Sequence, residues 1–129
     1  MVKTQKYREA LTSILLSTHL LAVERLRYVD HAKPIIPRAQ CFCRFCLHAV
    51  ETPEHALLEC TASDALLQLR RSFLEKLLNT APTLRQQMLE RNSLKFLKAM
   101  IYQRSTIVLV AKFAYDVLEL FYSVPIYRV

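Results

Sequence analysis

Apolar residues recur along most of this chain at intervals of three and four, which places them on one face of a helix. Residues 4–16 follow this pattern and are predicted to form a first amphipathic helix. Ser17 and Thr18 offer a break and a new cap, and a second helix is predicted from there to about residue 28. The apolar positions of these two helices are Tyr7, Leu11, Ile14, Leu15, Leu20, Leu21, Val23 and Leu26. Residues 30–40 contain Pro34 and Pro37, so an extended connector is expected there.

The same pattern predicts four helices in the second half of the chain. The first is expected to begin at Ser63 and to stop by Asn79 and Pro82, and the last is expected at about 106–122. Between them, one helix is expected to bear Leu84, Met88 and Leu89, and another Leu94, Leu97 and Ile101. Ser63 and Ser93 are predicted to cap two of them, and Thr83 with Gln86 has capping-box spacing. The apolar positions are Leu66, Leu69, Phe73, Leu77, Leu84, Met88, Leu89, Leu94, Leu97, Ile101, Val110, Phe113, Val117, Leu120 and Phe121.

Composition narrows the fold class further, because the chain contains no glycine. Tight hairpins and phosphate-cradling loops both depend on glycine, so neither is expected. The prediction is an all-α fold, a small bundle of about five to seven helices. At 129 residues the chain is expected to be one domain. It would comprise N-terminal helices (1–29), a connector and cysteine-rich segment (30–62), and C-terminal helices (63–124).

The cysteine-rich stretch CFCRFCLHAVETPEHALLEC, residues 41–60, is called the hook segment below. Cys43 and Cys46 form a Cys-x-x-Cys pair, and His55 and Cys60 complete a CCHC set. Three thiolates and one imidazole match the closed tetrahedral shell of one structural zinc ion, with no position for a reacting water. Buried free thiols and a disulfide are the alternatives.

Local features of the hook segment are consistent with a metal site. Thr52 followed by Pro53 is a strong helix start, and it places His55 in the first turn. On an ideal helix His55 and Cys60 point about 140° apart, so the helix is expected to end or distort just before Cys60. Cys41 and His48 are spare candidates, because neither completes a better-spaced ligand set.

A family resemblance rests on several stretches of the chain. These are LLSTHLLAVERLRY (15–28), the Cys-x-x-Cys pair with Arg44 and Phe45 inside it, VETPEHALLEC (50–60) and VAKFAYDVLELFY (110–122). Together they resemble the C-terminal zinc-binding region of reverse transcriptases from non-LTR retroelements, especially fungal ones. The resemblance covers nearly the whole chain and implies zinc ligands Cys43, Cys46, His55 and Cys60. It does not include the polymerase, endonuclease or ribonuclease H parts of such enzymes.

The chain is basic, with a formal net charge of +7. Three zinc-bound thiolates would reduce this by about one unit, so attraction to nucleic acid is a reasonable expectation. Phe45 is a candidate for stacking on an unpaired base, and Arg44 for contacting phosphate beside it. The other candidate contacts to RNA or DNA are Arg38, Arg70, Arg71, Arg91, Lys95 and Lys98. The alternatives are a solvated face for each cation and a small core under the metal for Phe45.

Catalysis is poorly supported by the sequence. Polymerase or nuclease chemistry needs clustered carboxylates for two metals, whereas the eleven acidic residues here are scattered. The available cysteines and histidines are better used as ligands than as nucleophile and base. We therefore expect a domain that is not an enzyme.

A second possible function is protein interaction or assembly. Hydrophobic residues make up 53% of the chain, so a homo-oligomer or a larger protein partner could cover the apolar helix at 106–122. Lys112, Asp116 and Glu119 interrupt that helix, which argues against a membrane span. The first residues lack a secretory-signal pattern, so a reducing compartment, nuclear or cytoplasmic, is expected.

Overall fold

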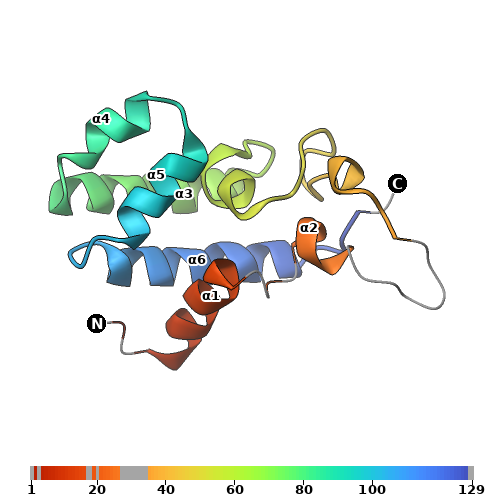
Figure 1. Cartoon of the computed structure of the whole chain (residues 1–129), viewed down its shortest axis with the longest axis horizontal. Coiled ribbons are helices and arrows are strands. Elements are labelled where there is room, and N and C mark those ends of the chain that lie inside the picture. The colour runs from red at the N-terminus through yellow and green to blue at the C-terminus, as the bar shows by residue number, and fades with distance from the viewer. Residues whose placement is uncertain (1, 3, 17–18, 20, 27–34, 128–129) are drawn as a thin grey trace.

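The computed structural model describes residues 2, 4–16, 19, 21–26 and 35–127 of the chain (Figure 1). The α-helices are α1 (Gln5–Leu15), α2 (Ala22–Arg25), α3 (Asp64–Thr80), α4 (Leu84–Leu89), α5 (Ser93–Ile101) and α6 (Ile107–Tyr122). Two shorter helices are η1 (Arg38–Gln40), a 3-10 helix, and η2 (His55–Glu59), a π-helix. No strand is present in these ranges, so the predicted all-α bundle is confirmed.

Helix α6 lies at the centre of the bundle and contacts α1, α3, α5 and η2. Figure 1 shows it running along the length of the molecule. Helix α6 can occupy the centre because apolar residues cover most of its circumference. Val110, Phe113, Val117 and Phe121 are among its buried side chains. The face predicted from periodicity is therefore the one that forms the core.

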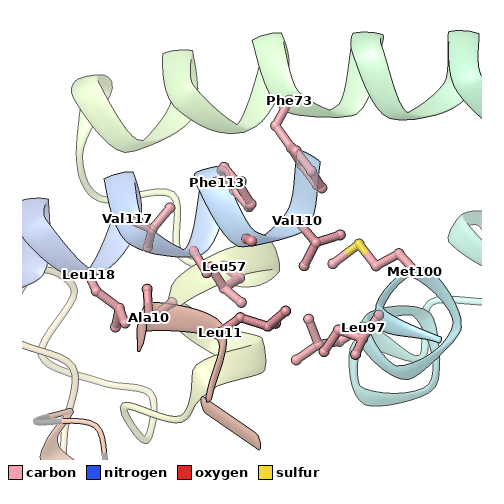
Figure 2. Packing of buried hydrophobic residues seen from close by; sticks show 14 of the residues in the cluster. Ala10, Leu11, Leu57, Phe73, Leu97, Met100, Val110, Phe113, Val117 and Leu118 are labelled. Carbon is pink, nitrogen blue, oxygen red and sulfur yellow. The ribbon is translucent and has the colours of Figure 1, made fainter. Parts of the chain in front are cut away.

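The core is built from facing aromatic and aliphatic side chains of several helices (Figure 2). Phe73 of α3 stacks on Phe113 of α6, with ring centroids 4.0 Å apart and planes 3° from parallel. Leu11 of α1, Leu57 of η2 and Leu97 of α5 belong to the same buried cluster. Fully burying a side chain of this size stabilises the fold by about 1.5–3 kcal/mol, so this cluster accounts for much of the stability.

Two helices, α3 and α5, begin with a side-chain cap, whereas α1 and α6 begin without one. The Ser63 hydroxyl oxygen accepts a hydrogen bond from the N–H of Leu66 at the start of α3, as predicted. For α5 the prediction was one residue late, because the cap is Asn92, whose Oδ1 accepts from the N–H of Lys95 at 3.1 Å. At α4, Thr83 is the capping residue by position, but its side chain makes no capping hydrogen bond. The expected capping box is therefore wrong.

The second predicted helix is much shorter than expected. Helix α2 covers only four residues, and Ser17, Thr18 and residues 27–28 lie outside the described ranges. A distant side chain takes the place of a local cap, because Glu51 Oε1 accepts from the N–H of Ala22 at 2.8 Å. The position of α2 is thus set by the hook segment.

A second, smaller cluster joins α2 to the connector. Ala22, Val23, Leu26, Ile36 and Cys41 are buried together. Within the predicted connector, residues 30–34 lie outside the described ranges, and Arg38–Gln40 form η1 instead of extended chain. This short turn leads directly into the hook segment.

Candidate metal centre

The CCHC residues converge on one point. The ligand atoms of Cys43, Cys46, His55 and Cys60 all lie within 4.8 Å of one another. The sulfurs of Cys43 and Cys60 are 3.8 Å apart, and the Cys46 sulfur is 3.5 Å from His55 Nε2. The four cysteines of the chain are free thiols, so the disulfide alternative does not apply. This group could hold a metal ion.

The first two ligands are presented by a tight turn. The chain reverses between Phe42 and Val50, which form an isolated antiparallel bridge. The N–H of Cys43 donates to the Ala49 carbonyl at 2.7 Å, and the N–H of Leu47 donates to the Cys43 carbonyl. Leu47 has a positive φ of 61°, a conformation that costs energy for a residue with a Cβ. In a chain without glycine, the surrounding turn holds Leu47 in that conformation.

The π-helix η2 brings the other two ligands together. Thr52 Oγ1 accepts from the N–H of His55, which confirms the expected cap. The N–H of Cys60 then donates to the His55 carbonyl at 2.9 Å, so the hydrogen bond spans five residues instead of four. This wider turn replaces the α-helical geometry in which the two side chains would point apart. The predicted distortion before Cys60 is confirmed.

Backbone N–H groups surround the sulfurs and favour their charged form. Burial raises the pKa of the Cys43 thiol to about 12, although the N–H groups of Cys46 and Phe45 act in the opposite direction. Burial also opposes ionisation of Cys46, but there the N–H groups of His48 and Ala49 and the neighbouring thiols outweigh it and lower the pKa. A bound dication would stabilise the thiolate form of both cysteines, including Cys43, whose burial otherwise opposes ionisation.

His55 places its Nε2 3.5 Å from the Cys46 sulfur. Burial lowers its pKa, while Glu59 acts to raise it. Glu59 Oε1 lies 3.5 Å from His55 Nδ1, on the side of the ring away from Cys46. A carboxylate in this place favours a proton on Nδ1 and leaves Nε2 free to bind a metal.

The two spare candidates do not join the set. The Cys41 sulfur contacts the carbonyls of Ile36 and Pro37 and lies in the smaller cluster around α2. His48 is exposed, and its Nδ1 lies 3.0 Å from the Cys46 carbonyl. Among the residues that the structure describes, the group consists of Cys43, Cys46, His55 and Cys60.

The side chain of Arg44 points into the protein, although the sequence placed it among the candidate phosphate contacts. Its side chain is 4% exposed and pairs with Glu51, which is fully buried. Arg44 Nη1 donates to the carbonyls of Phe121 and Val124 at the end of α6, at 2.8 and 2.9 Å. These partners are within the chain, so Arg44 is not available to phosphate in this conformation.

Arg70 and Phe45 are turned inward in the same way. The Arg70 guanidinium donates to the carbonyls of Ala56, Leu57 and Cys60, at 3.3, 2.8 and 2.7 Å. It thereby satisfies carbonyls at the end of η2. Phe45 packs edge-on against Phe121 with centroids 4.7 Å apart. Both side chains support the metal centre and the core, as the alternative interpretation of Phe45 expected.

The other candidate cations are exposed. These are Arg38, Arg71, Arg91, Lys95 and Lys98. Three of them lie between residues 84 and 104, where Arg85 and Arg104 are exposed as well and Glu90 is the only acid. We call these five cations, Arg85, Arg91, Lys95, Lys98 and Arg104, the α4–α5 basic surface. The sequence argument missed Arg85 and Arg104, although the near absence of acids in this stretch could have indicated them.

Two findings bear on what the chain is. Within the ranges that the structure describes, no helix has both the length and the apolar character needed to cross a membrane. Comparison with protein-family models, curated proteins and solved structures finds no match.

Proposed function

We propose that this chain is a zinc-stabilised helical domain that binds nucleic acid and carries out no catalysis itself. The observation that carries the proposal is the arrangement of the four ligand atoms, all within 4.8 Å of one another. The resemblance to the C-terminal zinc-binding region of non-LTR retroelement reverse transcriptases agrees with the proposal and stays a prediction.

Zinc is the metal that suits this ligand set best. Zn–S bonds of about 2.3 Å in a tetrahedron give sulfur–sulfur edges of about 3.8 Å. The Cys43 and Cys60 sulfurs are 3.8 Å apart, and the distance of 3.5 Å from Cys46 to His55 Nε2 suits the shorter Zn–N bond. Three soft thiolates and one imidazole also favour zinc over magnesium, calcium or manganese, which prefer oxygen ligands.

A structural role for the ion follows from its surroundings. Four protein ligands fill a tetrahedral shell and leave no position for water or substrate. Cys43, His55 and Cys60 are buried, and Cys43 and Cys60 belong to the main hydrophobic cluster. An ion held here would join the hook segment to the core of the bundle.

The α4–α5 basic surface is the region we propose for nucleic acid. It presents five exposed cations within 21 residues, and its single acid, Glu90, is paired with Lys95 at 2.9 Å. Such a concentration of positive charge attracts phosphates and releases counterions on binding. The sequence favoured the hook segment as the nucleic-acid surface. We propose the α4–α5 basic surface instead, because Arg44 and Phe45 are directed inward.

Binding of a labelled single strand to the zinc-loaded chain tests the proposal. Fluorescence anisotropy at about 50 and 200 mM salt is expected to show affinity that falls steeply with salt. Replacing Arg91 and Lys98 by Gln should weaken binding and reduce the salt slope by about one unit for each lost phosphate contact. The matched control replaces Lys6 and Lys76, exposed cations of α1 and α3, by Gln. Equal effects of the two double variants, or no binding at low salt, would contradict the proposal.

Docking of a protein partner on α6 is less favoured than the sequence suggested. The apolar face of α6 is already covered by α1, α3, α5 and η2.

A further inference from the structure

A groove beside the α4–α5 basic surface has a mixed apolar and charged lining. It has a volume of about 340 Å³ and lies where the end of α1, η1, the start of η2 and α5 meet. Leu15 and Leu94 provide half-exposed apolar walls. Arg38 and Lys98 contribute two cations from segments far apart in the sequence.

Tyr102 is the most exposed large hydrophobic side chain at this groove. It is 79% exposed, and it lies one helical turn after Lys98 at the end of α5. Residues four apart lie on the same helix face, and Tyr102 and Lys98 both line the groove. A lone exposed tyrosine needs no explanation, but one that borders an apolar groove with cations on two sides has the parts of a stacking site.

Glu54 distinguishes a site for a base from a site for a phosphate. It also lines the groove, and a carboxylate repels phosphate. A carboxylate can accept a hydrogen bond from the exocyclic amino group of a base, as it does with cytosine. The charges thus place the phosphates at Arg38 and Lys98 and the base near Glu54 and Tyr102.

We infer that this groove binds an unpaired nucleobase of a single strand, with Tyr102 as the stacking ring. The inference rests on the proposed function and adds a preference for single strands. In a duplex the bases are stacked on one another and their faces are not accessible to a side chain. Cytosine is expected to bind better than uracil, because only cytosine offers an amino donor to Glu54.

The chain contains no tryptophan, so Tyr102→Trp introduces one fluorescent reporter at the groove. The zinc-loaded variant is titrated with oligocytidine, oligouridine, oligodeoxycytidine, duplex DNA, an abasic strand of equal length, and polyglutamate. We expect strong quenching by the two cytosine strands and little by the duplex, the abasic strand or polyglutamate. The RNA and DNA arms show which sugar the groove accepts.

Anisotropy with substituted chains provides the second measurement. Tyr102→Ala should weaken single-strand binding by at least about fivefold, whereas Tyr102→Phe keeps the ring and should bind as the parent does. Tyr127→Ala removes another exposed tyrosine, outside the groove, and serves as the matched control. Glu54→Gln should abolish the preference for cytosine over uracil.

The outcomes separate the inference from the proposed function. Salt-sensitive binding that is equal for normal and abasic strands, and unaffected by Tyr102→Ala, would overturn the groove and leave phosphate binding intact. Quenching by polyglutamate as strong as by oligocytidine would also overturn it, because charge alone would then be sufficient. No binding to any strand at low salt would overturn both.

Discussion

Arg44 illustrates how far a side chain can depart from its sequence context. It lies between two candidate metal ligands in the chain, yet its guanidinium donates to the carbonyls of Phe121, in the last turn of α6, and Val124, just after that helix. Glu51 accepts from Arg44 and from the N–H of Ala22, so this one ion pair joins the hook segment to α2 and α6. Because both charged groups are buried, removing one leaves the other without compensation.

Glu51→Ala is therefore expected to lower the free energy of unfolding by about 3–5 kcal/mol. Urea unfolding of the zinc-loaded chain measures this change. Glu90→Ala removes an acid from an exposed pair with Lys95 and should cost less than about 1 kcal/mol. A double variant, Glu51→Ala with Arg44→Met, should recover part of the loss, because no buried charge then remains unpaired. A cost for Glu51→Ala no larger than that for Glu90→Ala would show that the pair is not needed.

Arg70 and Arg71 are adjacent in the chain and make a matched comparison. Arg70 is buried and donates hydrogen bonds to three carbonyls, two in η2 and one at Cys60. Arg71 is exposed. Arg70→Met should weaken metal affinity by about 10- to 100-fold, because the turn that holds His55 and Cys60 loses its support. Arg71→Met should leave the affinity unchanged. Competition with a chelator measures both values, and similar affinities for the two variants would contradict the role assigned to Arg70.

At the level of secondary structure, α5 shows what a local pattern can miss. Both Asn92 and Ser93 are good capping residues, and the sequence favoured Ser93. In the structure the Asn92 side chain accepts from the N–H of Lys95, while Ser93 is the first helical residue. Choosing between adjacent caps depends on the backbone angles of the preceding turn, where Arg91 has a positive φ of 57°.

Asn92→Ala is expected to lower the free energy of unfolding by about 1 kcal/mol, because an N–H at the start of α5 loses its acceptor. Ser93→Ala should change it by less than about 0.5 kcal/mol. Thermal and urea unfolding of the two variants measure the difference. A larger loss of stability for Ser93→Ala than for Asn92→Ala would show that Ser93 is the capping residue, as the sequence favoured.

The spacing of His55 and Cys60 predicted part of the structure of the π-helix η2. His55 and Cys60 are five residues apart, which is incompatible with two ligands on one face of an α-helix. The sequence could therefore predict that the helix distorts. It could not predict the hydrogen bond from Cys60 to His55, nor that Arg70, which lies on α3, donates to three carbonyls of this turn.

For the whole molecule, two of the candidate ligands are part of the core. Cys43 and Cys60 belong to the same buried cluster as residues of α1, α3, α5 and α6. The Arg44 side chain links the hook segment to the last turn of α6. Loss of the metal is therefore expected to destabilise helices that are distant from the site.

Chelation of the metal is expected to destabilise the entire bundle in one cooperative transition. The unfolding midpoint should fall for every helix together, because zinc binding contributes of the order of 10 kcal/mol in small structural sites. Circular dichroism at 222 nm gives the midpoint, and hydrogen exchange compares the hook segment with α6. Readdition of zinc is the control and should restore the parent curve. Protection of α6 that is unchanged by chelation would contradict the coupling.

The sequence by itself determined the helices of the core and the CCHC ligand set. Helical periodicity and ligand spacing are properties of residues a few positions apart, so they can be recognised without knowing the fold. The tertiary structure decided which way the charged side chains point. Arg44 meets a carbonyl 77 residues away and Ala22 meets a carboxylate 29 residues away, and no local pattern records such partners. The structure separates the candidate cations in the same way, because the side chains of Arg44 and Arg70 are buried whereas Arg91, Lys95 and Lys98 are exposed.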